Sequence, residues 1–302
     1  MSLLVVGSVA LDSIQTPLGK VAETLGGSAT YASLAARIFT TPRLVGVVGR
    51  DFPPRYRRLL AQEGVDLGGF VQAPGKTFRW QGRYGYDLNV AETLGVQLNV
   101  FQHFAPRLPA GWSATPCAFL GNIDPELQLR VRRQLTRPRL VACDSMNFWI
   151  GGKRRALLKV LKVVDLLFLN DAEARQLTGE SHLGRVAKAL LRCGPSVVVI
   201  KKGEHGALLA SPTALFSLPG YVVDDVHDPT GAGDSFAGAM VGSLASQRGG
   251  TWRWETMKRA MIYGSAVASL TIEAFGTARL VEATRPLVER RVAALRSLTH
   301  WR

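Results

Sequence analysis

The feature that most constrains the fold is an alternation along the chain between short apolar runs and longer segments of helical period. Six runs are rich in β-branched residues, namely residues 3–9, 43–49, 117–122, 139–144, 165–170 and 196–202. Strands that are apolar on both sides must be covered on both faces. The pattern therefore predicts an α/β fold with helices on both faces of one central, mostly parallel sheet.

Segments of helical period lie between these runs. Helices are expected over residues 28–39, 53–63, 125–135, 153–164, 172–177 and 183–193. Asp124 and Pro125 form an N-cap and first-position pair that suits a helix start. The runs GALLAS and ALFSLPG predict two antiparallel strands, and a long helix and two more follow up to about residue 298. We expect residues 1–302 to form a single domain.

One region interrupts this rhythm. Residues 70–101 alternate polar side chains with aromatic ones (Phe78, Trp80, Tyr84 and Tyr86), and glycines mark turns. This hairpin pattern is too polar for the buried sheet. It predicts a small β lid formed by about residues 12–25 and 70–101, of the kind that excludes water from a reaction. A plain surface hairpin is the alternative.

The charge of the chain could suggest a nucleic-acid partner. With 37 Lys and Arg against 23 Asp and Glu, the formal net charge is +14. Phosphate neutralisation would give such a chain affinity for nucleic acid. However, the cations are dispersed over segments that read as amphipathic helices, where they are typical of a solvated face. Nucleic-acid binding is therefore the weaker interpretation, and an anionic substrate would also be attracted.

The cysteines and the apolar runs bear on the compartment. Cys117, Cys143 and Cys193 stand apart without the spacing of a zinc site or a disulfide framework, which fits a reducing compartment. The sequence contains neither an apolar run of membrane length nor a signal-peptide pattern. We expect a cytoplasmic protein without a membrane partner.

The stretch DPTGAGDSFAG, residues 228–238, carries the chemistry. Gly231, Ala232 and Gly233 leave the mouth of a predicted helix without large side chains, so its unpaired N–H groups can bind phosphate oxygens. A carboxylate at that place would repel a phosphate. Asp234 is therefore predicted to act as a proton acceptor for an attacking hydroxyl. By itself the pattern is weak, since Asp is also a common helix cap.

DPTGAGDSFAGAM resembles the C-terminal signature of the ribokinase-like (PfkB) family of sugar and nucleoside kinases, and three further stretches fit in the same order. The resemblance covers nearly the whole chain. It implies a ribokinase-like three-layer α/β/α fold. It also implies that residues 231–233 form the anion hole and that Asp234 is the catalytic base.

The stretch GGSATY resembles the substrate side of that family. Gly26 and Gly27 resemble the paired glycines that let the substrate approach the backbone. Asp12 resembles the acid that binds substrate hydroxyls, although a turn cap is an alternative. The family usually has asparagine where this chain has Tyr31, and an aromatic ring there could stack on a sugar or on a base.

Two stretches resemble the nucleotide side of the family. NDAE places Asn170 and Glu173 where the family organises Mg²⁺, and KKGEHGALL aligns Gly203 and Gly206 with the nucleotide-side turn. Lys201 stands where many members have threonine. It would reach a nucleotide phosphate or be a solvated strand end.

Five further positions resemble elements of the family. Asp228 and Thr230 match residues that in several members help to hold a monovalent cation such as K⁺. Gly276 would belong to that site or to the nucleotide pocket. Asp144 and Asn147 resemble an element near the phosphates.

These features together predict an ATP-dependent, Mg²⁺-requiring phosphotransferase that acts on a primary hydroxyl of a sugar. A nucleoside kinase of the same family is the first alternative. A non-catalytic protein that binds a ligand or nucleic acid on this fold is the second. By analogy with relatives, two chains are expected to pair through the lid.

Overall fold

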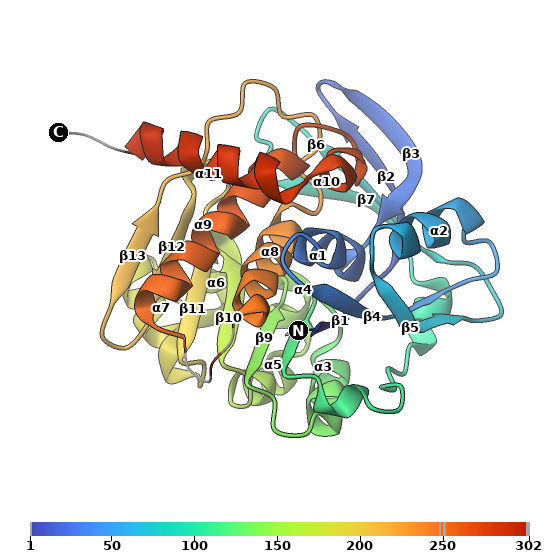
Figure 1. Cartoon of the computed structure of the whole chain (residues 1–302), viewed down its shortest axis with the longest axis horizontal. Coiled ribbons are helices and arrows are strands. Elements are labelled where there is room, and N and C mark those ends of the chain that lie inside the picture. Colours follow the sequence, from blue (N-terminus) through green and yellow to red (C-terminus); the bar gives the residue numbers. More distant parts are fainter. Residues whose placement is uncertain (1, 248, 250–251, 300–302) are drawn as a thin grey trace.

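The computed structural model describes residues 2–247, 249 and 252–299. Within them the large sheet runs in the order β13-β12-β11-β10-β9-β8-β1-β4-β5 (Figure 1). The strands from β11 to β5 are parallel, and β12 and β13 are antiparallel. All six predicted runs contain a strand of this sheet, and the antiparallel pair is also confirmed. The strands are β1 (Ser2–Val6), β4 (Thr41–Val48), β5 (Asp66–Gln72), β8 (Cys117–Leu120), β9 (Leu140–Asp144), β10 (Leu166–Asn170), β11 (Val197–Lys201), β12 (Ala207–Ala210) and β13 (Leu215–Leu218).

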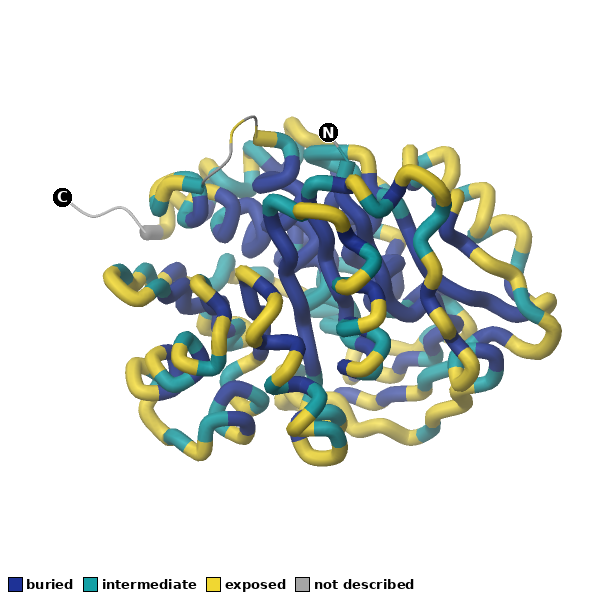
Figure 2. Tube along the Cα trace, turned by 90° about the horizontal axis from the view of Figure 1, so that it is seen from below, coloured by how far each residue is buried: buried dark blue, intermediate teal, exposed yellow. Residues whose placement is uncertain are grey.

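Helices cover both faces of this sheet. Leu3 and Val5 of β1 lie in one core with α1, α8 and α9, while Leu4 and Val6 lie in the other with α3, α5, α6 and α7. Successive side chains of a strand point to opposite faces, which explains the unbroken apolar runs. Figure 2 shows the central strands buried beneath exposed loops. The helices are α1 (Ser28–Ala36), α2 (Pro54–Gln62), α3 (Pro125–Gln134), α4 (Asn147–Gly152), α5 (Arg154–Leu161), α6 (Asp171–Thr178), α7 (Leu183–Arg192), α8 (Ala232–Ser246), α9 (Trp254–Thr271), α10 (Ala278–Glu282) and α11 (Arg285–Thr299).

Small residues bring α1 and α8 together. A Cβ at Gly238 would overlap the backbone of Ala32, and one at Gly242 would lie 2.9 Å from the Cα of Ala36. Both pairs are spaced by four residues, so they lie on the facing sides of the two helices. The close crossing places the N-terminus of α8 beside that of α1 (Figure 1).

A second sheet stands to one side of the first, at the upper right of Figure 1. Its order is β3-β2-β6-β7, from β2 (Ala10–Thr16), β3 (Gly19–Gly26), β6 (Phe78–Tyr84) and β7 (Ala91–Gln97). The expected lid boundaries need one correction, because residues 70–72 belong to β5 of the large sheet. Phe70 is buried against Phe52, with ring centroids 5.6 Å apart, so the core holds this segment.

The strand order indicates where a ligand-binding site is expected. The chain adds β4 and β5 on one side of β1 and then β8 to β11 on the other, so the order reverses between β1 and β8. Ligands of open α/β sheets bind at the carboxyl ends of strands near such a reversal. Asp144, Asn170 and Lys201 are the last residues of β9, β10 and β11. They therefore lie along that edge.

Two expectations remain outside what the fold can test. None of the helices in the described part of the chain is both long and apolar enough to span a membrane. The cytoplasmic location and the pairing of two chains through the smaller sheet stay predictions.

Candidate active site

The N-terminus of α8 is the centre of the site. Gly231 precedes the helix with φ 76°, in the left-handed region. A Cβ at this position would also overlap the ring of Tyr31 on α1. Glycine is therefore required both by the backbone conformation and by the packing of the two helices. The Ala232 N–H donates to the Pro229 carbonyl at 3.2 Å, so a turn already uses one of the amides predicted to bind phosphate.

Asp234 lies half-buried in the first turn of α8. Burial, together with the charge of Asp144, raises its pKa to about 7, and the opposite charge of Lys201 limits the rise. A carboxylate with such a pKa is a competent proton acceptor near neutral pH. The helix terminus beside it is suited to an anion. The role of Asp234 as proton acceptor and the binding of an anion at this terminus stay predictions.

One flank of Asp234, which we call the Asp12 side, comprises Asp12, Gly26, Gly27, Tyr31, Tyr84, Asp228, Thr230 and Gly276. Asp12 is only 4% exposed. Burial raises its pKa to about 7, a hydrogen bond from the Gly27 backbone lowers it, and Asp228 and Asp234 raise it. A Cβ at Gly26 would overlap the Asp12 carboxylate. The paired glycines therefore make room for this acid.

Two phenols lie in the same region. Tyr31 is 1% exposed, and its hydroxyl has no hydrogen-bond partner among the described residues. The Tyr84 hydroxyl, from β6 of the smaller sheet, accepts a hydrogen bond from Thr230 Oγ1 at 3.2 Å. Burial raises the pKa of both phenols, so both are neutral hydrogen-bonding groups at physiological pH. Tyr84 was not predicted as a site residue.

Asp228 joins two loops at the base of the Asp12 side. It is 1% exposed, and its two carboxylate oxygens accept from the backbone N–H groups of Thr230 at 2.9 Å and Gly276 at 2.8 Å. Burial raises its pKa, and these hydrogen bonds oppose the rise. The structure therefore places Gly276 against Asp228, and its expected part in the cation site or in the nucleotide pocket stays a prediction. A monovalent cation at Asp228 and Thr230 stays a prediction.

The other flank, the Lys201 side, comprises Asp144, Asn170, Glu173, Lys201, Gly203 and Gly206. Lys201 Nζ lies 2.7 Å from Asp144 Oδ2, and the two side chains are 15% and 5% exposed. Burial opposes the lysine charge, but Asp144 and Glu173 raise its pKa overall. A Cβ at Gly233 would lie 3.0 Å from Nζ. Lys201 is thus a buried cation at the mouth of α8 and not a solvated strand end.

Asn170 and Glu173 form a capping box at the start of α6. The Glu173 carboxylate accepts from the Asn170 N–H, and the Asn170 side chain accepts from the Glu173 N–H, both at 2.8 Å. Burial raises the pKa of Glu173 to about 7, with Asp144 adding and Lys201 opposing. Asn147 lies apart, exposed at the start of α4, where its side chain accepts from the Phe148 N–H.

The described residues include no group of three or more His, Cys, Asp or Glu side chains that could hold a metal ion. Mg²⁺ usually keeps several waters and binds through one or two carboxylates plus substrate phosphates. Asp144, Glu173 and Asp234 are close enough to influence one another's protonation, with Lys201 as the cation that counters them. The residues fit a hydrated magnesium ion that is carried mainly by phosphates.

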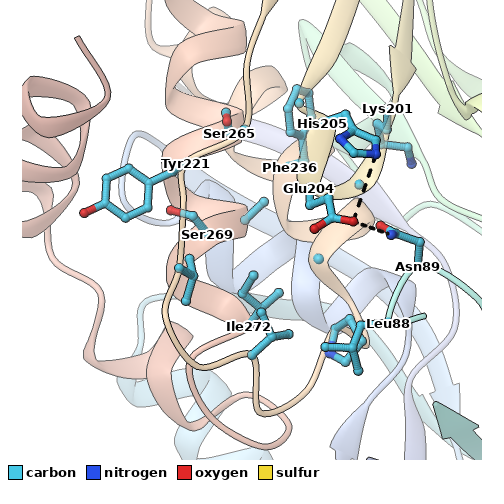
Figure 3. Close-up of a pocket in the computed structure, with 18 of the residues that line it drawn as sticks. Leu88, Asn89, Lys201, Glu204, His205, Tyr221, Phe236, Ser265, Ser269 and Ile272 are labelled. Atoms are coloured by element: carbon cyan, nitrogen blue, oxygen red, sulfur yellow. Dashed lines mark hydrogen bonds and ion pairs between the residues drawn. The ribbon is translucent and has the colours of Figure 1, made fainter. Parts of the chain in front are cut away.

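A cavity of about 420 Å³ opens on the Lys201 side (Figure 3). Its walls are the turn 203–206, the segment 220–223 with Val226, the start of α8, one face of α9 and the hairpin turn 86–89. Gly206, with φ 84°, would overlap Leu218 if it carried a Cβ. The sequence did not predict that residues 220–226 and 86–89 contribute to the wall of this cavity. Neither segment has a motif, and they reach the cavity only through the tertiary fold.

The chain is similar to known proteins in sequence and in fold. The family model described as pfkB family carbohydrate kinase matches residues 130–284. A cytidine kinase of Thermococcus kodakarensis is 30% identical over 82% of this chain and 90% of its own length.

Two solved structures share the fold. The nucleoside kinase of Methanocaldococcus jannaschii has a TM-score of 0.75 at 19% identity, covering 97% of this chain and 98% of its own. A fructokinase of Vibrio cholerae, with fructose, ADP and a calcium ion bound, has a TM-score of 0.78 at 18% identity, covering 96% and 98%.

Proposed function

Because the chain belongs to the pfkB family of carbohydrate kinases, we propose that it transfers the γ-phosphoryl group of ATP to a primary hydroxyl of a nucleoside. One observation carries this proposal. The carboxylate of Asp234, whose pKa burial raises to about 7, lies in the first turn of α8, and the neighbouring Ala232 and Gly233 line the cavity. A proton acceptor and an anion-binding helix terminus are the two parts that phosphoryl transfer to an alcohol requires.

The chain's own residues take distinct parts in the proposed reaction. Asp12 accepts hydrogen bonds from acceptor hydroxyls and holds the primary hydroxyl toward Asp234. Asp234 takes the proton as the oxygen attacks in line. The amides at the start of α8 that are not used in turns stabilise the negative charge of the transferring group, and Lys201 adds a buried positive charge. Glu173 and Asp144 would hold a hydrated Mg²⁺ ion, which would supply charge neutralisation on the phosphates when bound.

The acceptor is the finer part of the proposal. The sequence by itself favoured a sugar, and two observations now favour a nucleoside. The cytidine kinase is similar over 82% of this chain and 90% of its own length. A nucleoside kinase of Methanocaldococcus jannaschii is also 22% identical over 63% of this chain.

A sugar is the second candidate. A 2-dehydro-3-deoxygluconokinase of Bacillus subtilis is 36% identical, although over only 38% of this chain. The fructokinase described above shares the fold. Either acceptor presents the primary hydroxyl that Asp234 would deprotonate, so the proposed chemistry is the same.

The test is ADP release from ATP and Mg²⁺ with cytidine, adenosine, ribose, fructose or 2-keto-3-deoxygluconate, with and without K⁺. We expect turnover that requires Mg²⁺ and is fastest with a nucleoside. Faster turnover with a sugar would show that a sugar, the second candidate, is the acceptor. No ADP release with any compound, together with salt-dependent DNA binding, would support the non-catalytic alternative.

A further inference from the structure

The turn that joins β6 to β7 forms a wall of the cavity. Tyr86, Asp87, Leu88 and Asn89 all line it, although they belong to the smaller sheet. Figure 3 shows Leu88 and Asn89 across the cavity from Tyr221 and Ser269. Tyr86 and Asn89 are exposed, so these side chains stand at the cavity mouth and are not part of the core.

Asn89 contacts the turn that follows β11. Its side-chain oxygen occupies the space that a Cβ at Gly203 would fill, and its Nδ2 lies 3.4 Å from Glu204 Oε1. The Asn89 backbone N–H and side-chain amide also bond to Asp87 Oδ1 at 3.0 and 3.2 Å. The hairpin turn is therefore internally ordered, and the missing side chain of Gly203 lets it approach.

The same hairpin is fixed on the Asp12 side a few residues earlier. Tyr84 is buried and accepts the hydrogen bond from Thr230, which stands next to Gly231. Strand β6 also pairs with β2, with Trp80 opposite Asp12. One short segment thus touches both flanks of Asp234, and a displacement of the hairpin would alter both at once.

We propose that residues 86–89 form part of the nucleotide site and that the Tyr84–Thr230 contact holds them over it. This rests on the proposed function, since it assigns the cavity to the phosphoryl donor. Asn89 offers the donor a polar amide, and Leu88 covers an apolar part of it. Loss of the Tyr84 anchor weakens nucleotide binding although Tyr84 does not line the cavity.

The test is binding of N-methylanthraniloyl-ADP with Mg²⁺, followed by fluorescence, in the full-length protein. Asn89→Ala is expected to weaken binding about five- to twentyfold, in the range of coupling and contact effects at such sites. Tyr84→Phe is expected to weaken it less. The double variant is expected to bind much like Asn89→Ala, because both changes release the same segment. A thermal melt of each variant checks that the fold is kept.

Glu92→Gln is the matched control. Glu92 lies in β7 of the same sheet, is exposed, pairs with Arg83 and does not line the cavity. Its variant is expected to bind the nucleotide like the wild type. Wild-type affinity in Asn89→Ala, or additive effects in the double variant, would overturn the inference. Failure of the wild-type protein itself to bind the nucleotide would instead overturn the proposed function.

Discussion

The two flanks of Asp234 are built in opposite ways. On the Asp12 side, Asp12, Tyr31 and Asp228 are almost fully buried, and backbone N–H groups fix the two carboxylates. On the Lys201 side, one buried ion pair lies beside a cavity of about 420 Å³ whose walls include exposed loops.

This difference suits two ligands of different kinds. Neutral or weakly acidic groups on the Asp12 side can bind an uncharged polyol without repelling it. The cavity with Lys201 can take a large anion. Asp234 lies where the two meet, and burial together with Asp144 raises its pKa toward neutrality. The contrast between the two flanks predicts that substitutions on one flank will have different effects from substitutions on the other.

Asp234→Asn is expected to give the largest effect, because it removes the proton acceptor that both flanks serve. General-base catalysis typically contributes about 10²–10⁴-fold, so kcat should fall by that factor. The affinity for ADP should change little, since the α8 backbone remains. The measurement is ADP release beside nucleotide binding. Glu255→Gln, at an exposed position in α9, is the control, and full turnover in Asp234→Asn would contradict the assignment.

Lys201→Met is expected to act mainly on the stability of the Lys201 side. It leaves Asp144 buried without its ion pair, and breaking a buried pair costs about 3–5 kcal/mol. The loss in the free energy of unfolding should be smaller at pH 5 than at pH 8, because Asp144 can take up a proton at pH 5. Urea unfolding at both pH values tests this, with Lys202→Met as the neighbouring control. An equal and small loss at both pH values would show that the pair is solvated.

Asp12→Asn should raise the free energy of unfolding, whereas Lys201→Met should lower it. The pKa of Asp12 is raised to about 7 from the unfolded value of 3.8. Its stabilising contribution is therefore present below pH 4 and lost as pH rises through 7. Relative to the wild type, the variant should gain about 1–3 kcal/mol in the free energy of unfolding at pH 8, and little at pH 4. A gain that does not depend on pH would contradict this account.

Tyr31→Phe should have the smallest effect on stability. The Tyr31 hydroxyl is buried without a hydrogen-bond partner among the described residues, so its removal should leave the free energy of unfolding unchanged or raise it by about 1 kcal/mol. Tyr84→Phe, which loses the contact with Thr230, should lower the free energy of unfolding by about 1 kcal/mol. Urea unfolding compares the two. If the acceptor bonds to the Tyr31 hydroxyl, Tyr31→Phe should also raise the acceptor KM while kcat changes less.

The framework of this molecule could be predicted from local patterns. Strands apolar on both sides indicated the large sheet, and the glycines before Asp234 indicated the start of a helix. The same patterns could not separate residues 70–72 from the lid, because it is their pairing with β4 and the contact of Phe70 with Phe52 that assign them to the large sheet. The short helix α4 was also not predicted.

Contacts between distant segments were beyond the reach of the sequence. The hairpin 86–89 reaches the cavity because β6 pairs with β2, a fact of sheet register and not of motif. The backbone N–H of Gly276 donates a hydrogen bond to the Asp228 carboxylate, and the two residues lie far apart in the sequence. The Lys201–Asp144 pair joins the ends of β11 and β9, two strands that do not neighbour each other in the sheet.

The central claim is that burial at the mouth of α8 makes Asp234 a proton acceptor near neutral pH. The direct measurement is its pKa, followed by NMR in protein labelled with ¹³C at the aspartate carboxyl groups. The signal is assigned by its loss in Asp234→Asn. The account predicts a titration midpoint near 7. A midpoint near the ordinary value of 3.8 would contradict it.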